Sequence, residues 1–372
     1  MARWSIVTVA ARQPTFIRSD KVVLAGGAVA LVAAGLTRYV GGGAVLAFVC
    51  SAVAVTLLAA LVGRAVDQLG ERFGPGATGI LQSALGNLPE LFIALFALKA
   101  GLVAVVQAAL IGSILANLLL VMGICFVVGG LRHGPQRLGS DRARSIIVMM
   151  VLSVAAMVLP SLASYVHTPA AGHESSLSLI VSVILLALFV LTLPASLRRE
   201  QPAEIGSGEA KPHVEAEPPR WSLALAVGML VLAAVAGAFV SDWFVTALEP
   251  AMDALGITEA FAGLVIVAIA GNAIENVVGV QLAAANRSEY AFSVVINSPL
   301  QIALVLAPLL VILSQIFGLA TLTLVFPPML VVSVVLAVVL SAFITFDGES
   351  TWIEGAALIA VYGIIATSFW WG

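Results

Sequence analysis

Two stretches of the chain share one pattern: GNLPELFIALFALKAGLVAVVQAALIGSILAN at residues 86–117, and GNAIENVVGVQLAAANRSEYAFSVVINSPLQI at residues 271–302. Each opens with Gly-Asn-x-x-Glu, and each has a serine 23 residues after its glutamate. A pattern that recurs at equal spacing indicates an internal repeat. The shared positions are Gly86, Asn87, Glu90 and Ser113 in the first copy, and Gly271, Asn272, Glu275 and Ser298 in the second.

Both copies lie in a strongly apolar chain. Of its 372 residues, 61% are hydrophobic and 10% are charged, whereas soluble domains have about 45–50% apolar and about 25% charged residues. Apolar stretches of about 20 residues, enough to cross a hydrocarbon layer about 30 Å thick, recur from end to end. They are continuous, as in residues 102–130, and lack the alternating polarity of a β-barrel strand. The composition therefore predicts an all-α polytopic membrane protein.

The apolar stretches predict about 11 transmembrane helices. The predicted spans are residues 22–39, 40–62, 76–99, 103–130, 144–165, 175–197, 221–244, 257–285, 290–316, 322–346 and 351–370.

The two copies of the pattern lie on the third and eighth predicted spans, which cross the membrane in opposite directions. This is typical of the inverted-topology repeats of secondary transporters, whose binding sites lie near the membrane midplane. We therefore expect two inverted five-helix repeats plus one extra N-terminal helix. The predicted parts are an N-terminal segment with the first helix at 1–39, a first repeat at 40–197, an acidic cytoplasmic linker at 198–220 and a second repeat at 221–372.

The distribution of basic residues predicts the orientation. With the N-terminus in the cytoplasm, 15 of the 17 Lys and Arg residues face inward, as the positive-inside rule requires. The C-terminus then lies outside. We expect a multi-pass protein of the bacterial inner membrane, because the first residues show no cleavable signal peptide. Acidic residues are expected in the outward loops, at Glu174, Glu249, Asp253, Asp347 and Glu349.

Glu90 and Glu275 are the acidic residues predicted to lie deep in the membrane, and no Lys or Arg accompanies them there. An ionised glutamate at a helix centre costs about 2.5–3.5 kcal/mol. Burial and a neighbouring carboxylate favour the protonated form, and a bound cation favours the ionised form. Competition of protons and a cation for the same oxygens is the chemistry of an antiporter. We expect no enzymatic activity and no bound cofactor, because no His lies in a predicted span.

Two carboxylates match the charge of a divalent ion. Side-chain oxygens of Asn87, Asn272, Ser113 and Ser298 would help to complete the 6–8 ligands that Ca2+ accepts. Mn2+ also takes oxygen ligands, so the residues alone leave the identity of the cation open. Helix breaks that would expose backbone carbonyls to the ion are expected at Gly86, Gly271, Gly112 and Pro299.

The sequence resembles the calcium/proton antiporter family (CAX) of the sodium/calcium exchanger superfamily. The resemblance rests on AVDQLGERFGP, GNLPELFIALFALKAG and GSILANLLLV in the first half, and on GNAIEN in the second. It implies alternating access with Glu90 and Glu275 as the paired ion-binding and proton-binding glutamates. It further implies positions near that site for Asn87, Asn272, Ser113, Ser298, Asn117 and Gln301.

Some residues depart from that family pattern. Asn276 stands where the family usually has His, Asn297-Ser298-Pro299 replaces Gly-Ser-Ser, and Pro89 replaces a small or polar residue. Asn276 removes a group that would titrate near neutral pH. A Na+ or K+/H+ antiporter on the same scaffold therefore remains an alternative, and a passive cation channel is an alternative from another class.

The remaining polar residues carry weaker expectations. Gln107 is assigned to helix contacts, Cys50 and Cys125 to packing, and the linker glutamates to a solvated loop. The expected partners are membrane lipid, the transported cation and protons, with no nucleic acid. Homo-oligomerisation is left open.

Overall fold

The computed structural model describes residues 15–73, 85–138, 140–199 and 219–371. The side chains of Glu71, Phe73, Ile274, Glu275 and residues 140–145 and 193–199 lie outside this description. Most of the predicted linker, with its glutamates, and the first part of the predicted span 76–99 also lie outside the described residues.

The described chain is mainly helical. Its α-helices are α1 (Arg18–Tyr39), α2 (Ala44–Phe73), α4 (Leu88–Lys99), α5 (Val103–Leu115), α6 (Met122–His133), α7 (Ser140–Tyr165), α8 (Glu174–Arg199), α9 (Leu223–Leu255), α10 (Glu259–Phe261), α11 (Ala268–Gly271), α12 (Ala273–Ala284), α13 (Ser288–Gln301), α14 (Ala307–Ile316), α15 (Pro328–Ile344) and α16 (Trp352–Ser368). Three π-helical segments are η1 (Ala116–Val121), η2 (Ala262–Val267) and η3 (Ile302–Leu306). Two short strands are β1 (Gln136–Arg137) and β2 (Glu349–Ser350).

The predicted class, a helical membrane protein, is confirmed. Within the described residues, seven helices are long and apolar enough to cross a membrane. An eighth span is formed if the bent pair Glu259–Gly271 and Asn276–Ala284, which meet at 60°, counts as one. Two shorter apolar helices, α15 and α16, follow.

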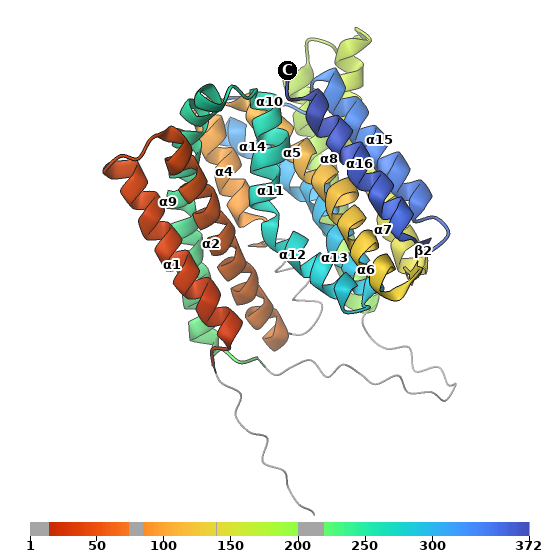
Figure 1. Ribbon diagram of the computed structural model, residues 1–372. Helices are drawn as coiled ribbons and strands as arrows, with labels where there is room; N and C mark the ends of the chain where they lie inside the picture. The colour runs from red at the N-terminus through yellow and green to blue at the C-terminus, as the bar shows by residue number, and fades with distance from the viewer. Residues whose placement is uncertain (1–14, 74–84, 139, 200–218, 372) are drawn as a thin grey trace, which may run out of the picture.

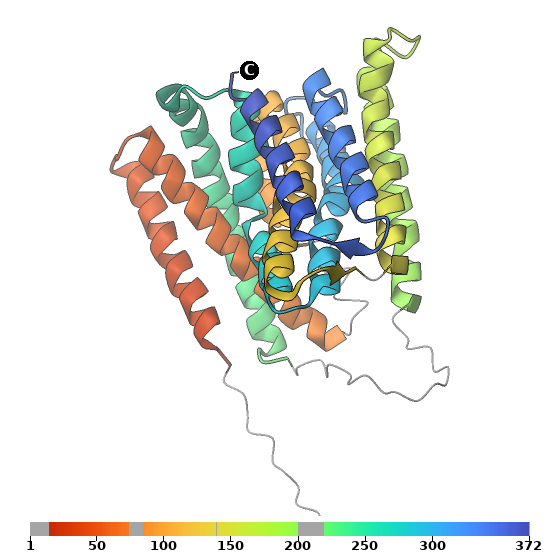
Figure 2. The ribbon, with the colours of Figure 1, turned by 45° about the vertical axis from the view of Figure 1, so that its right-hand side comes forward.

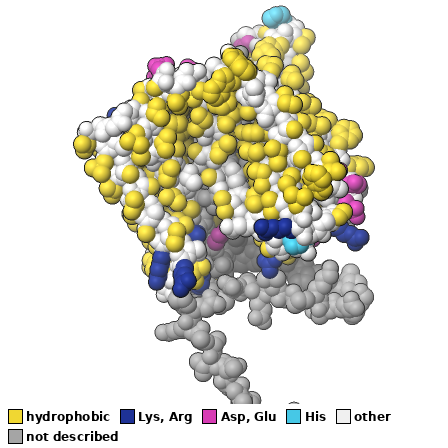
Figure 3. Space-filling view, viewed as in Figure 1, with side chains coloured by type: hydrophobic (Ala, Val, Ile, Leu, Met, Phe, Trp, Pro, Cys, Tyr) yellow, Lys and Arg dark blue, Asp and Glu magenta, His cyan; other side chains and the backbone are white. Residues whose placement is uncertain are grey.

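The helices pack side by side, with α1, α2 and α9 at one flank of the molecule (Figure 1). α5, α6, α12 and α13 lie toward the centre. α1 begins at one end of the bundle, and α16 finishes at the opposite end. The space-filling view shows hydrophobic side chains over most of the visible face, with Lys and Arg gathered at the end where α1 begins (Figure 3). Such a surface suits a lipid environment with polar boundaries.

The two strands correct one expectation about the loops. β1 follows α6 and pairs antiparallel with β2, with Arg137 opposite Glu349 (Figure 2). We expected Arg137 to face inward and Asp347 and Glu349 to face outward. The two parts of that expectation cannot both hold, because the pairing of β1 with β2 places Arg137 and Glu349 at the same end of the bundle (Figure 2).

The chain between α14 and α15 differs from the predicted span 322–346. It is non-helical until Pro328, although Leu322 and Leu324 are fully buried. Side chains satisfy its backbone: Ser178 Oγ accepts from Leu324 N at 2.9 Å, and Ser161 Oγ accepts from Phe326 N at 2.9 Å. Non-helical backbone is tolerated at membrane depth only where protein encloses it in this way.

Gln107 of α5 belongs to the same arrangement. Its Nε2 donates to the carbonyl oxygens of Thr323 and Val325, at 3.2 and 2.8 Å. The expected contact with a neighbouring helix is therefore replaced by a contact with the non-helical segment.

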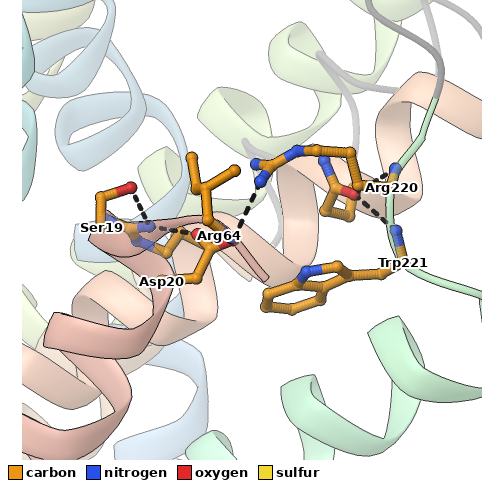
Figure 4. Close-up of polar contacts among 7 residues, drawn as sticks. Ser19, Asp20, Arg64, Arg220 and Trp221 are labelled. Atoms are coloured by element: carbon orange, nitrogen blue, oxygen red, sulfur yellow. Dashed lines mark hydrogen bonds and ion pairs between the residues drawn. The ribbon is translucent and has the colours of Figure 1, made fainter. Parts of the chain in front are cut away.

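A charged cluster joins α1, α2 and the start of α9. Asp20 is 1% exposed and forms ion pairs with Arg64 of α2 and with Arg220, the latter at 2.9 Å (Figure 4). Gln68 Oε1 accepts from the backbone N–H groups of Arg220 and Trp221, at 2.8 and 2.9 Å. The cluster links three segments that are far apart in sequence.

We expect Asp20→Asn to destabilise the protein by about 3 kcal/mol, because removing one member of a buried ion pair leaves the other charges uncompensated. Unfolding in detergent, followed by circular dichroism, measures the effect. Asp253→Asn is the matched control, since Asp253 is an exposed carboxylate of α9. Equal stability of the two variants would contradict a stabilising role for the cluster.

Candidate functional site

Each Gly-Asn pair lies directly before the start of a helix. α4 begins at Leu88, directly after a turn at Gly86 and Asn87, and Asn272 separates α11 from α12 (Figure 1). The two asparagines have nearly the same backbone conformation: φ −92° and ψ 18° at Asn87, and φ −93° and ψ 11° at Asn272. The repeated sequence thus produces the same local turn twice.

Glu90 lies in the first turn of α4, where its side chain reaches the break in the other half of the chain. A Cβ added to Gly271 would meet Glu90 Cγ at 2.8 Å and Oε1 at 3.1 Å. Glycine at position 271 therefore makes room for the carboxylate. Glu90 and Ser113 also line a crevice, whose walls include Ile93, Val106 and Leu306.

Asn272 is the centre of a buried hydrogen-bond network. Its Nδ2 donates to Ser113 Oγ and to the carbonyl oxygen of Ala268, both at 2.9 Å. Its Oδ1 accepts from Ser298 Oγ at 3.1 Å and from Asn117 Nδ2 at 3.2 Å. The network joins side chains from both halves of the sequence.

Asn117 is fully buried at 0% exposure. Its Nδ2 lies 2.9 Å from the carbonyl oxygen of Ser113 and 3.3 Å from Ser298 Oγ, in addition to its contact with Asn272. Among the described residues, no group donates a hydrogen bond to Asn117 Oδ1. A buried amide oxygen of this kind is suited to a cation or a water molecule.

Asn87 has different partners from Asn272. Its Nδ2 donates to Gln301 Oε1 at 3.2 Å. Its buried Oδ1 has no hydrogen-bond donor within the described part of the chain. Asn87 and Gln301 therefore also connect the first copy of the pattern to the second.

The backbone of Glu275 lies in the first turn of α12, which begins after the break at Asn272. The side chain of Glu275 lies outside the described residues. The structure thus brings together Glu90, Asn87, Ser113, Asn117, Asn272, Ser298 and Gln301, and it gives Glu275 only a backbone position.

The expected breaks at Gly112 and Pro299 are wrong, because α5 continues through Gly112 and α13 through Pro299. Gly112 instead allows two helices to touch: an added Cβ would lie 2.5 Å from Leu264 Cα. The helices widen into π-helical segments only later, at Ala116 and Ile302.

Two further polar residues lie near the site: Thr56, which the sequence pattern does not single out, and Asn276, which stands where the family usually has His. Thr56 of α2 donates to the carbonyl oxygen of Ala270, beside Gly271, at 3.2 Å. Asn276 has a buried Oδ1 with no partner among the described groups. An isolated hydroxyl inside an apolar span is the only signal that Thr56 offers.

The arrangement collects carboxylate, amide and hydroxyl oxygens at the junction of the two sequence copies. Oxygen ligands of this kind suit hard cations such as Ca2+. Within the described residues, no three or more His, Cys, Asp or Glu side chains are grouped so that they could hold a metal ion. Amide and hydroxyl oxygens would therefore have to complete any cation site.

Several known proteins are similar to this chain over most of its length. The Ca2+/H+ antiporter of Synechocystis is 36% identical over 349 residues, which cover 89% of this chain and 92% of that protein. The Ca2+/H+ antiporter ChaA of Bacillus subtilis is 36% identical over 347 residues, covering 91% and 97%. The structure of native YfkE superimposes with a TM-score of 0.78 at 32% identity, covering 95% of this chain and 99% of that one.

The family model for the sodium/calcium exchanger protein matches residues 43–197 and 225–371. These two matches cover both copies of the Gly-Asn-x-x-Glu pattern and confirm the resemblance inferred from the sequence. The chain belongs to the sodium/calcium exchanger protein family.

Proposed function

We propose that this protein is a secondary active antiporter that exchanges Ca2+ for H+ by alternating access. The observation that carries the proposal is the position of Glu90, which lines a crevice and whose carboxyl group reaches the helix break in the other half of the chain. The Synechocystis and Bacillus relatives are Ca2+/H+ antiporters, which supports Ca2+ as the cation.

In this mechanism the carboxyl groups of Glu90 and Glu275 either each bind a proton or together coordinate the cation. A carboxyl group in a membrane interior is favoured in its neutral form, so it holds a proton when the ion is absent. Ca2+ displaces the protons because it provides compensating charge and accepts several oxygen ligands. Amide oxygens of Asn87 and Asn117 would complete the ligand set around the carboxylates.

We propose further that residues 40–197 and 221–372 are inverted repeats, with an extra helix at 1–39, a linker at 198–220 and eleven spans in all. The equal turns at Asn87 and Asn272 support this division. So does a second repeated motif, AVDQLG at 65–70 and AMDALG at 251–256, near the last residues of α2 and α9.

The orientation follows from the same division. The basic end of the bundle would face the cytoplasm and carry the N-terminus, and the C-terminus would lie outside. The bacterial relatives favour the inner membrane, with lipid around the apolar face.

Everted membrane vesicles that contain the protein test the proposal. A respiration-driven proton gradient is established, and Ca2+, Mn2+, Mg2+, Na+ and K+ are added separately while lumenal pH is recorded. We expect saturable release of protons on addition of Ca2+. Proton release on addition of Na+ or K+ alone would show that the transported cation is Na+ or K+ and not Ca2+. The absence of proton release with every cation would overturn the proposal of antiport.

A further inference from the structure

The repeated sequence treats Asn87 and Asn272 as equivalents, yet their amide groups are used differently. A side-chain amide has two N–H donors and one oxygen with two lone pairs. Asn272 uses all four: Nδ2 donates to Ser113 Oγ and the Ala268 carbonyl, and Oδ1 accepts from Ser298 and Asn117. An oxygen with both lone pairs engaged has none left for a cation.

The orientation of this amide is fixed by its neighbours. The carbonyl oxygen of Ala268 can only accept a hydrogen bond, so the atom of Asn272 that lies 2.9 Å from it must be the nitrogen. Rotation of the amide by 180° would place two oxygens against each other. Oδ1 of Asn272 is therefore held toward Ser298 and Asn117.

The amide of Asn117 is oriented in the same way, but its oxygen is left without a hydrogen-bond donor. Its Nδ2 lies 2.9 Å from the Ser113 carbonyl oxygen, which again can only accept. The contact with Asn272 Oδ1 holds the same nitrogen from a second side. The buried Oδ1 of Asn117 thus remains without a donor among the described residues, as does Oδ1 of Asn87.

We propose that Asn272 is a positioning residue and not a ligand of the transported cation. It orients the amide of Asn117, so that Asn117 Oδ1 can bind the ion, and it ties Ser113 of the first half to Ser298 of the second. The ligand amides are then Asn87 and Asn117. This inference rests on the proposed cation transport. It gives different roles to Asn87 and Asn272, which occupy equivalent positions in the repeated sequence.

A double-mutant cycle tests the proposal by equilibrium binding of radioactive Ca2+ to the purified full-length protein. We expect Asn272→Ala to weaken binding about tenfold, on the scale of a residue that orients a metal ligand, and Asn117→Ala, which removes the ligand itself, to weaken binding at least as much. If Asn272 acts through Asn117, the double variant binds no more weakly than the single Asn117→Ala variant. Asn272→Ala combined with Asn87→Ala is the matched pair, and there the two losses should multiply.

A second test uses two Asn→Asp variants, which should change the affinity for Ca2+ in opposite directions. Asn87→Asp puts negative charge on a ligand oxygen, so it should tighten Ca2+ binding severalfold. Asn272→Asp replaces the donor to the Ala268 carbonyl by an oxygen, so it should weaken binding. Size-exclusion chromatography and the unfolding temperature identify any variant that does not fold. If a variant of one test does not fold, the binding data of the other test decide whether Asn272 is a positioning residue.

The proposal is overturned if Asn272→Ala and Asn117→Ala weaken binding multiplicatively, or if Asn272→Asp tightens binding as Asn87→Asp does. Failure of the proposed function has a different signature, because the unmodified protein would then bind no Ca2+. If the unmodified protein instead carries Na+ or K+, the same cycle is measured with that ion, and the same two outcomes apply.

Discussion

Glu90→Gln is expected to abolish proton-coupled Ca2+ transport, with no detectable flux above protein-free membranes. Glutamine keeps the size of the side chain and retains one oxygen, but it carries no negative charge and holds no exchangeable proton. Its amide would still fit beside Gly271, where the carboxyl group of Glu90 now lies. Loss of transport would therefore be caused by the missing charge and proton, and not by a change in the structure around the helix break at Gly271.

The effect is measured as calcium-dependent proton release in everted vesicles, at protein levels matched by immunoblot. Glu249→Gln is the matched control, because Glu249 is an exposed residue of α9. Glu275→Gln should match Glu90→Gln, since the second copy of the pattern carries its glutamate at the same place. Full transport in either glutamate variant of the pattern would remove that residue from the mechanism.

Gly112→Ala is expected to disrupt the fold. The added Cβ would lie 2.5 Å from Leu264 Cα and 2.7 Å from Leu264 C, and closer still to the carbonyl oxygen of that residue. These are backbone atoms of η2, so no side-chain rotation can relieve the overlap. Overpacking of a core usually costs about 1–3 kcal/mol, and a clash with backbone belongs at the upper end or beyond. Small residues at close helix crossings are a general requirement in membrane proteins.

Yield of the monodisperse protein and its unfolding temperature in detergent measure this effect. Gly63→Ala and Gly237→Ala are matched controls on α2 and α9, because an added Cβ at either position meets nothing within 4 Å. Alanine is the better helix former by about 1 kcal/mol, so the controls should be as stable as the unmodified protein or slightly more stable. A Gly112→Ala variant as stable as these controls would contradict the close crossing.

The sequence was most informative where residue type alone decides the structure. Long apolar stretches predict membrane helices, because the bilayer requires every backbone group to be satisfied within the segment. The Gly-Asn pairs predicted the two breaks at the correct residues. Family membership followed from the same pattern and is confirmed by the family model.

Long-range partners explain what the sequence did not show. The apolar run around Leu322 predicts a helix, but the segment is non-helical, and hydroxyl groups of Ser161 and Ser178 accept hydrogen bonds from its backbone N–H groups. These serines are more than a hundred residues away in the chain. Likewise, the repeated motif suggested equal roles for Asn87 and Asn272, and only their different neighbours distinguish them.

Calcium uptake into liposomes reconstituted with the purified protein tests the central claim, coupled exchange, most directly. The lumen is made acidic relative to the medium, and radioactive Ca2+ is added outside at a concentration equal to that inside. We expect transient accumulation of Ca2+ above its equilibrium level, and this accumulation should disappear when nigericin and K+ collapse the pH gradient. Ca2+ that only equilibrates, at a rate indifferent to the pH gradient, would contradict antiport and indicate a passive pathway.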